Sequence, residues 1–594
     1  MLRAIYGIVI LMCAKLAFGQ FITHGPVIGG ATPTTARMYV RTAQAMPITV
    51  ELSTDSNFST VLSFNALTKA EKDSSTIFPL TGLQANTTYF YRVSDGTIYD
   101  TVKGQFKTFP NEGQRGRYDW VVVSCQEFGT YNAFNAIYNQ KPHLFFHTGD
   151  WTYPDYQIQP DYRLDTSLIQ FSYRRRYSEQ KMPQVLRNTV TDYIYDNHDG
   201  AGAAVNLSFT SSSYDSATNT VTNYVDFQPI PPIAKQNTLK GYFDYFPSYP
   251  AVDSSKGLYH SYKFGNAEVF FVDVRNCGNG LDSMFRYDSL SNRWSLRNSP
   301  NATLLGADQM AWLKQGLRNS TADWKFIVSG VMFNKAFRKV IQYAMALQDS
   351  RLSIGGITGT GLLLAHSMAW NWAGYPIEQD AFLQYLEDND VKDVIVLSGH
   401  VHTNVMDDGT NAGLPELNTG PVAGSGAELT YYIDSVMRLF GLGAAIDSLW
   451  NGGGMGVENQ NFKSGFGKIE IYSNDSVVLR TIDEDNIVVS SMTIPHSSKV
   501  TSVKPTEPAP VCVIDKVYPN PTGNAINVKL CRDYSPSKKD KAFLIGTDGR
   551  IIPVEVPADK NNLKIDVKDL PSGNYIFLYD YPDGLFTKSV QVIH

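Results

Sequence analysis

The stretch 119–126 reads DWVVVSCQ, a run of large apolar residues that ends in Ser124-Cys125-Gln126. Such a run, bounded by polar residues, is typical of a strand buried on both faces, as in the sheets of α/β proteins. Similar runs recur at 144–147, 193–195, 326–328 and 394–397, and helical patterns, for example at 308–317 and 379–386, lie between some of them. Strands that alternate with helices predict an α/β layered domain.

A cluster of polar residues follows four of these runs. Ser124-Cys125-Gln126 follows the first run, and the other three clusters are Gly149-Asp150-Trp151-Thr152-Tyr153, Asp196-Asn197-His198-Asp199 and Ser398-Gly399-His400-Val401-His402. In open α/β sheets the carboxyl ends of the strands converge on the ligand site. We therefore expect the four clusters to meet at one place.

Two of the clusters contain residues that suit a pair of metal ions. An aspartate can bridge two cations, and Asp150 is the natural candidate. His400 and His402 lie two residues apart on a predicted turn, so their imidazoles can reach different ions. Two metal ions about 3.5–4 Å apart clamp a phosphate, lower the pKa of a bound water and stabilise in-line attack.

Three further side chains complete the set of candidate ligands. Asn197 offers a neutral carbonyl oxygen, and Cys125 and Tyr153 could supply a thiolate and a phenolate, which favour an ion such as Fe(III). Each motif also has an ordinary reading, because a Gly-Asp pair is a common turn and an isolated cysteine is more often a small buried hydrophobe. Four such clusters, each after a strand, favour the metal site.

The N-terminus has the features of an export signal. Arg3 supplies a positive charge, residues 4–14 are apolar but too short to span a bilayer, and Ala17-Phe18-Gly19 predicts cleavage before Gln20, although Lys15 interrupts the pattern. We expect no transmembrane segment elsewhere. The net charge of −6 gives no basic field of the kind that nucleic-acid binders need, so a stable nucleic-acid complex is not expected.

The chain divides into several predicted segments. A signal peptide over 1–19 is followed by a β-sandwich over 20–112, where Leu83–Val93 resembles the tyrosine corner of fibronectin type III domains, with Tyr89 at the corner. A catalytic domain over 117–494 follows and ends in a predicted hairpin. A linker rich in Pro, Ser, Thr and Lys covers 495–511, and a small β-module covers 512–594.

The order of these motifs resembles that of the calcineurin-like metallophosphoesterases. Tyr153 is similar to the tyrosinate ligand of purple acid phosphatases, and Ser124-Cys125-Gln126, Tyr173-Arg174-Arg175-Arg176-Tyr177 and Trp372-Ala373-Gly374-Tyr375-Pro376 resemble segments of the PhoD-like alkaline phosphatases. That family also has a fibronectin-like domain in front, so the resemblance covers residues 20 to about 495. It implies a β-sandwich flanked by helices, in four layers (αββα).

The resemblance also implies a role for each site residue. The first metal, Fe(III), would be held by Cys125, Asp150, Tyr153 and His402, and the second by Asp150, Asn197 and His400. His198 would hydrogen-bond the phosphoryl oxygen or the leaving group. One of Arg174, Arg175 or Arg176 would grip the phosphate, and a solvated helix face is the alternative for these arginines.

Two departures from the family pattern concern the second metal. Many PhoD-like enzymes have an aspartate in place of His400, which suits calcium, whereas an imidazole favours Zn, Mn or Fe. The wider superfamily has a further histidine where this chain reads Val328–Asn334, so Asn334 or His366 would have to substitute. His143 and His147 are expected to pack near the site, and Asp273 is expected to orient a ligand.

The last segment resembles the C-terminal sorting domain of the type IX secretion system of Bacteroidota. Tyr518-Pro519-Asn520-Pro521 and Leu570-Pro571-Ser572-Gly573-Asn574-Tyr575 carry this resemblance. It implies export through the periplasm and outer membrane to the cell surface or medium, after which such a domain is typically removed. Cys512 and Cys531 lie near each other in the sequence and could form a disulfide.

Three functions are compatible with these observations. The leading one is a secreted phosphatase that hydrolyses phosphate monoesters through a dinuclear metal centre and a metal-bound hydroxide. The second is a phosphodiesterase acting on nucleotides, phospholipid head groups or teichoic-acid-like polymers, since the fold supports both. The third is a non-catalytic surface protein that binds through a phosphatase fold. Insertions at about 335–375 and 430–460 could form the wall that decides between monoester and diester substrates.

Overall fold

The structure is a computed structural model, and the description below covers residues 19–127, 132–153, 162–179, 181–200, 212–215, 220–223, 232–279, 285–288, 290, 293–296, 299–348, 351–354, 357–360, 362, 365, 369–424, 450, 463–499, 514–519, 522–530, 540–546, 551–556, 562–581 and 584–594. Residues 1–18 of the predicted export signal, His366, Cys512 and Cys531 lie outside these residues, as does nearly all of the insertion at 430–460.

Two sheets form the N-terminal domain. One has the order β1-β2-β5, and the other has the order β4-β3-β6-β7. Their strands are β1 (Ile22–Gly29), β2 (Thr35–Thr42), β3 (Pro47–Ser53), β4 (Leu62–Leu67), β5 (Ser75–Thr81), β6 (Thr88–Ser94) and β7 (Tyr99–Lys107), with the short helix η1 (Ala70–Lys72) before β5. The Tyr89 hydroxyl accepts a hydrogen bond of 2.9 Å from the backbone amide of Gln84.

A seven-stranded sheet forms one half of the central domain. Its order is β10-β9-β8-β24-β25-β26, and β23 pairs with the end of β8. β8, β9 and β10 run parallel, so their carboxyl ends lie at one edge, whereas β24 runs antiparallel to β8. The strands are β8 (Arg117–Gln126), β9 (Leu144–His147), β10 (Val190–Tyr193), β23 (Pro421–Ala423), β24 (Gly465–Tyr472), β25 (Ser476–Asp483) and β26 (Val488–Pro495).

A six-stranded sheet forms the other half. Its order is β13-β14-β17-β20-β22-β21, and β14, β17, β20 and β22 run parallel. The strands are β13 (His260–Phe264), β14 (Ala267–Val272), β17 (Trp324–Ser329), β20 (Val394–Ser398), β21 (Val405–Asp408) and β22 (Pro415–Asn418). Apolar side chains of the two sheets pack together, with 4.9 Å between the ring centroids of Trp120 and Phe326 and 5.8 Å between those of Phe146 and Phe271.

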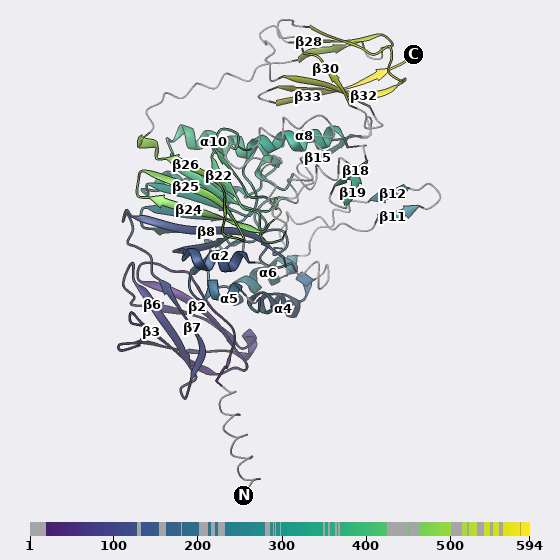
Figure 1. Cartoon of the computed structure of the whole chain (residues 1–594). Helices are drawn as coiled ribbons and strands as arrows, with labels where there is room; N and C mark the ends of the chain where they lie inside the picture. Colours follow the sequence, from purple (N-terminus) through teal and green to yellow (C-terminus); the bar gives the residue numbers. More distant parts are fainter. Residues whose placement is uncertain are drawn as a thin grey trace.

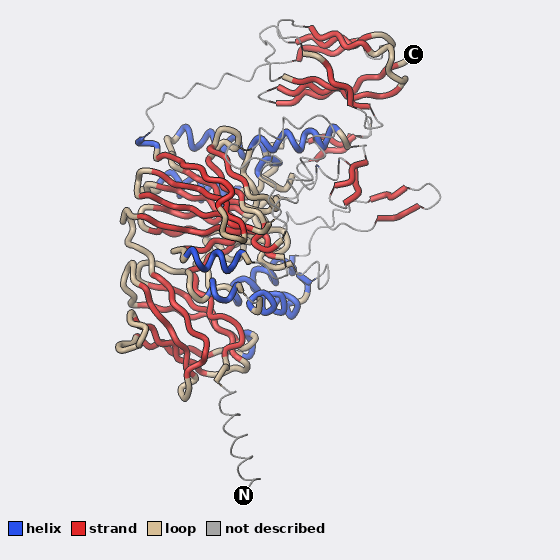
Figure 2. The backbone as a smooth tube through the Cα atoms, viewed as in Figure 1, coloured by secondary structure: helices blue, strands red, loops and turns tan. Residues whose placement is uncertain are grey.

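Helices lie on both sides of this pair of sheets (Figures 1 and 2). Four lie toward the N-terminal domain: α2 (Ala133–Gln140), α4 (Thr166–Tyr177), α5 (Met182–Leu186) and α6 (Pro232–Tyr245). On the opposite side lie α8 (Arg338–Ala346) and α10 (Pro376–Asp388), and α7 (Ala307–Asn319) contacts α10. The predicted alternation of strands and helices is confirmed, and the helical patterns at 308–317 and 379–386 correspond to α7 and α10.

The described residues also include short hairpins and single turns of 3-10 helix between the larger elements. Three hairpins consist of β11 (Ser212–Asp215) and β12 (Thr220–Asn223), β15 (Phe285–Asp288) and β16 (Arg293–Leu296), and β18 (Arg351–Ile354) and β19 (Ile357–Thr360). Single turns of 3-10 helix are η2 (Tyr162–Leu164), η4 (Lys335–Phe337), η5 (Trp372–Gly374) and η7 (Ser497–Lys499). No helix among the described residues is long and apolar enough to cross a membrane.

The C-terminal domain also has two sheets. One has the order β27-β28-β31, and the other has the order β30-β29-β32-β33. Their strands are β27 (Ile514–Tyr518), β28 (Ala525–Leu530), β29 (Lys541–Gly546), β30 (Ile551–Val554), β31 (Asn562–Asp566), β32 (Gly573–Tyr581) and β33 (Gly584–Val592). Residues of both sheets, among them Val528, Leu544 and Phe577, form a core of their own.

A buried ion pair joins the edge strands of the two central sheets. His260, at the start of β13, directs Nε2 to the carboxylate of Asp192 on β10 at 2.9 Å and Nδ1 to the carbonyl of Leu258 at 2.7 Å. Both partners are about 2% exposed. Burial by itself would lower the pKa of His260, but the Asp192 carboxylate raises it above its ordinary value. The protonated imidazole can donate to both acceptors.

This pair predicts a pH-dependent contribution to stability. Because the pKa of His260 is raised on folding, the contribution is complete below about pH 6.5 and is lost as the pH rises through the raised pKa. We expect the free energy of unfolding of the wild-type protein to exceed that of the His260→Gln variant by an amount that shrinks, on the order of 1 kcal/mol, between pH 6 and pH 9. Urea denaturation at several pH values measures this difference, and a difference that does not vary with pH would contradict the assignment.

Candidate metal centre

The four polar clusters lie at the ends of strands β8, β9, β10 and β20. Cys125 is the penultimate residue of β8, Asp150 follows β9, and His400 and His402 follow β20. All four adopt a left-handed backbone, with φ angles of 49°, 57°, 78° and 46° in that order. Residues with side chains rarely adopt this conformation, and it is concentrated at functional sites where the surrounding structure enforces it.

Asp150 lies at the centre of the cluster. Its Oδ2 lies 3.6 Å from Cys125 Sγ, and its Oδ1 accepts a hydrogen bond of 2.9 Å from the backbone amide of His198. The side chain is buried. Burial raises the pKa of Asp150 well above its ordinary value, and the nearby Asp196 and Cys125 raise it further. A cation would reverse this effect, because it favours the charged carboxylate.

Tyr153 and His402 lie next to Asp150. The Tyr153 hydroxyl is 3.4 Å from Nε2 of His402, and its ring centroid is 4.2 Å from that of His198. Burial raises the pKa of the Cys125 thiol to about 12 and that of Tyr153 well above its ordinary value. Thiol and phenol are therefore protonated near neutral pH unless a metal ion displaces their protons.

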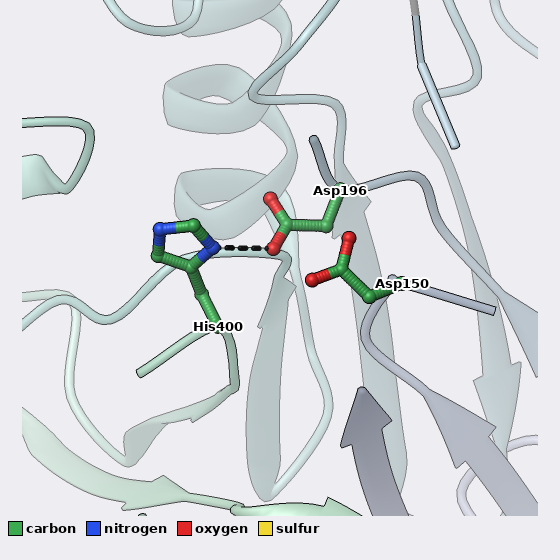
Figure 3. Close-up of side chains that lie close together, drawn as sticks. All are labelled: Asp150, Asp196 and His400. Carbon is green, nitrogen blue, oxygen red and sulfur yellow. Dashed lines mark hydrogen bonds and ion pairs between the residues drawn. The ribbon is translucent and has the colours of Figure 1, made fainter. Parts of the chain in front are cut away.

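Asp196 is an acidic residue of the site for which we predicted no role from the sequence. Its Oδ2 lies 2.7 Å from Nδ1 of His400. Donor atoms of Asp150, Asp196 and His400 all lie within 4.8 Å of one another, a spacing that could hold a metal ion. Figure 3 shows the Nδ1 edge of the His400 ring facing both carboxylates, while its other nitrogen points away.

Arg275 balances the charge of Asp196. The guanidinium donates from Nε to Asp196 Oδ1 at 2.6 Å, and both side chains are about 1% exposed. Burial by itself would raise the pKa of Asp196, but Arg275 and His400 hold it below its usual range. Asp273, which we expected to orient a ligand, accepts hydrogen bonds from the backbone amides of Arg275 and Asn276, each of 2.9 Å.

Asp199 fixes the loop that carries Asp150. Its carboxylate accepts hydrogen bonds from the backbone amides of Trp151 at 3.1 Å and Thr152 at 2.9 Å. Burial raises the pKa of Asp199 to about 6. Gly149 is required here because its φ is 123° and an added Cβ would lie 2.4 Å from Cβ of Asp196. The loop after β9 and the loop after β10 therefore pack so closely that no side chain fits at position 149.

A second polar network supports the turn that carries both histidines. Ser398 donates to Glu416 Oε1 at 2.5 Å, and the Asn418 amide donates to the carbonyl of Gly399 at 2.9 Å. Burial raises the pKa of Glu416 to about 7. On the other side, Ser124 donates to the carbonyl of Thr419 at 2.7 Å, which ties the residue before Cys125 to the same network.

The side chain of Asn197 tests whether this pocket fits a cation. Its Oδ1 is buried and accepts no hydrogen bond from any residue that the structure describes. A buried acceptor without a donor is costly, and an ordered ion or water usually satisfies it. The surrounding groups are mainly acidic, which favours a cation. The site therefore fits metal ions through both the orphan oxygen and the chemistry of its donors.

Models of known protein families match three parts of the chain. Residues 16–110 match the N-terminal domain of PhoD-like phosphatases, and residues 120–434, more than half of the 594-residue chain, match the PhoD-like phosphatase domain. The chain belongs to the PhoD-like phosphatase family. Residues 516–592 match a secretion system C-terminal sorting domain. The resemblances inferred from the motifs are thus confirmed for both the family and the last domain.

Individual relatives of this PhoD-like chain are distant. It is 24% identical to alkaline phosphatase D of Bacillus subtilis (strain 168) over 400 residues, a match that covers 64% of this chain and 60% of that relative. A solved structure described as PhoD superposes with a TM-score of 0.57 at 18% identity, over 81% of this chain and 91% of that one. This second likeness concerns the fold.

The arginines of α4, one of which we expected to grip phosphate, point in different directions in this PhoD-like chain. Arg174 forms an ion pair with Asp73 of the N-terminal domain. Arg176 is buried and donates to the backbone carbonyl of Gln126, next to Cys125. Burial lowers the pKa of Arg176 to about 10. Of the two, only Arg176 lies beside a candidate ligand.

The remaining polar residues singled out in the sequence have structural contacts. The Asn334 side chain accepts a hydrogen bond of 2.9 Å from the amide of Ala336, so it caps η4. His147 accepts one of 3.3 Å from Gly149, and His143 accepts one of 3.2 Å from Asp119. These contacts agree with the packing roles expected of both histidines.

The Asp196–Arg275 pair predicts a large loss of stability when one partner is removed. Arg275→Met leaves a buried carboxylate without its cation, and we expect it to lower the free energy of unfolding by about 3–5 kcal/mol. Adding Asp196→Asn should restore part of the loss. Urea denaturation in the presence of a chelator measures both effects.

The exposed pair of Arg115 and Asp323 supplies the control. The Arg115 side chain is 55% exposed and lies 2.8 Å from Asp323. Arg115→Met should therefore change the stability little, because solvent screens such pairs. Equal losses in the Arg115→Met and Arg275→Met variants would contradict the role given to Arg275.

Proposed function

We propose that this protein is a secreted, metal-dependent phosphatase that hydrolyses phosphate monoesters at a dinuclear metal centre. One observation carries the proposal: candidate ligands from four strand ends lie together around the buried Asp150, with Asn197, His400 and His402 partly exposed. Membership of the PhoD-like phosphatase family supports the reaction class, a phosphoric ester hydrolysis. The candidate ligands are Cys125, Asp150, Tyr153, Asp196, Asn197, His400 and His402.

The first ion would be held by Cys125, Asp150, Tyr153 and His402. This assignment is supported by the 3.6 Å between Cys125 Sγ and Asp150 Oδ2 and the 3.4 Å between the Tyr153 hydroxyl and His402 Nε2. Thiolate and phenolate together stabilise a trivalent ion, which favours Fe(III) at this position. Both groups have raised pKa values, so binding should release protons.

The second ion would be held by Asp150, Asn197, His400 and Asp196. We propose Asp196 for the position that the sequence left open, because Asn334 is engaged with its own helix. Two ligands bound side by side to one ion at about 2.1 Å each lie about 3 Å apart. The 2.7 Å between His400 Nδ1 and Asp196 Oδ2 is close to that value. Zn, Mn, Fe and Ca are all compatible with this set.

The protein groups around the ions would position the reaction. When bound, the ions would polarise the phosphoryl oxygens and lower the pKa of the attacking water. The imidazole of His198, held against the Tyr153 ring, would donate a hydrogen bond to the phosphoryl oxygen or the leaving group. Arg176 would hold the backbone at Gln126, and with it Cys125, by its buried hydrogen bond.

The finer assignments of the architecture belong to the same proposal. We infer a fibronectin III-like domain over 20–112, a four-layer αββα catalytic domain over 117–494 and a β-sandwich sorting domain over 512–594. The strand orders β1-β2-β5 and β4-β3-β6-β7 and the contact of Tyr89 support the first of these. An export signal over 1–19 and type IX secretion to the cell surface or medium would complete the route.

Substitution of the central ligands tests the proposal. Asp150→Asn and His402→Ala should each lower kcat/KM for p-nitrophenyl phosphate by about 10³-fold or more, equivalent to roughly 4 kcal/mol of transition-state stabilisation. Far-ultraviolet circular dichroism should show that both variants remain folded. The bis ester of p-nitrophenol serves as the comparison substrate, and faster turnover of that diester by the wild-type enzyme would overturn the preference for monoesters.

Tyr153 provides an optical test of the metal at the first position. A ferric phenolate absorbs visible light, so the purified protein should be coloured and elemental analysis should find iron. Tyr153→Phe should remove the visible band while leaving the second metal in place. A colourless protein that retains full activity would exclude Fe(III) bound by Tyr153.

A further inference from the structure

Two central strands of the C-terminal domain are apolar on both faces. On β29, Ala542 and Leu544 point into the core of the domain, whereas Phe543 and Ile545 point to the opposite side. On β32, Tyr575 and Phe577 line the core, and Ile576 and Leu578 alternate with them. A sheet that faces water on one side normally has polar residues on that side, so the outer face of this sheet needs a partner.

The four outward side chains form one continuous surface. Phe543 lies opposite Leu578 and Ile545 lies opposite Ile576 in the antiparallel pairing of β29 with β32. Residues directly opposite each other in such a pair lie on the same face and contact one another. We call this surface, defined by Phe543, Ile545, Ile576 and Leu578, the outer patch.

The outer patch is covered by the phosphatase domain. Phe543, Ile545 and Leu578 are only 6%, 2% and 0% exposed, and they belong to the same hydrophobic cluster as the side chains of α8. Figure 1 shows α8 directly beneath the C-terminal domain, and β33 contacts this helix. From Val340 to Gln348 every residue except Gln342 is buried. The helix is therefore covered on the side of the C-terminal domain as well.

We propose that the outer patch is a docking surface for α8, so that the sorting domain is packed against the phosphatase domain and not merely tethered to it. The partner is a helix of the same chain, and the contact is apolar. It follows that the two domains remain associated when the connection between them is cut. Separating the two domains exposes an apolar surface on each domain. Any protein that binds the outer patch must therefore first displace α8.

Hydrogen exchange in the intact chain tests this contact. In the wild-type protein the amides of α8 should be protected, and Leu578→Asp should accelerate their exchange by at least about 10-fold, because it places a charge in the contact. Amides of β8 and β20, far from the contact, should not change. Persistent protection in β28 and β31 would show that the C-terminal domain of the variant remains folded. Unchanged α8 exchange in that folded variant would overturn the proposal.

The matched control lies on the other sheet of the same domain. Lys564 on β31 is exposed, so Lys564→Asp introduces the same acidic residue without touching the outer patch, and the exchange of α8 should stay as in the wild type. Acceleration by both substitutions to the same extent would count against a specific surface.

Cleavage of the connection between the two domains provides a second measurement, which requires no substitution in the outer patch. A site for a specific protease is introduced between residues 503 and 508 of the otherwise wild-type chain. After cleavage, size-exclusion chromatography at about 50 µM should give one peak that contains both fragments in equal amounts. Elution of the wild-type fragments as two separate peaks at this concentration would overturn the proposal.

Discussion

The concentration of buried acidic groups at one point is the constraint on which the rest of this structure depends. Asp150, Asp196 and Asp199 are all within a few per cent of complete burial, and the Cys125 thiol lies among them. Charges of one sign cannot be buried together without compensation. The guanidinium of Arg275 compensates part of this negative charge. The buried Oδ1 of Asn197, which has no hydrogen-bond donor among the described residues, marks a position where a bound cation would compensate more. Burial and the neighbouring acidic groups raise the pKa of Asp150, so its charged form needs a nearby positive charge.

The protein meets this constraint by drawing on both sheets. Asp150 and Asp196 follow neighbouring parallel strands of one sheet, whereas Arg275 and His400 come from the other. The site can therefore exist only when the two sheets are packed face to face, which the aromatic contacts of Trp120 with Phe326 secure. The packing of the hydrophobic core therefore determines the electrostatics of the site, because it brings the acidic residues of one sheet next to Arg275 and His400 of the other.

The sequence was most informative where local patterns determine the outcome. Buried strands followed by polar clusters predicted the α/β domain, the meeting of the clusters and six of the candidate ligands. Asp196 lies within one of the four polar clusters, but nothing in a linear pattern distinguishes it from a turn residue, because its partner Arg275 is 79 positions away. For the same reason Asp199 was not recognised as the anchor of the Asp150 loop.

The arginines of α4 illustrate a second limit. Tyr173-Arg174-Arg175-Arg176-Tyr177 reads as a single basic segment, but successive residues of a helix point about 100° apart. Arg174 consequently faces the N-terminal domain while Arg176 faces the strand that carries Cys125. Composition can identify such a segment, and only the packing around the helix assigns a partner to each side chain.

The ion pair of Arg174 with Asp73 connects the N-terminal domain to helix α4 of the central domain. Asp73 also receives Arg41 from its own domain and the hydroxyl of Tyr245 from α6 at 2.7 Å, so three groups from two domains share one carboxylate. Arg174, which contacts Asp73, lies two positions before Arg176, which donates to the carbonyl of Gln126 next to Cys125. The N-terminal domain therefore contacts, through Asp73, the same helix that supports the backbone next to Cys125 through Arg176, so the domain boundary lies one helix away from a candidate metal ligand.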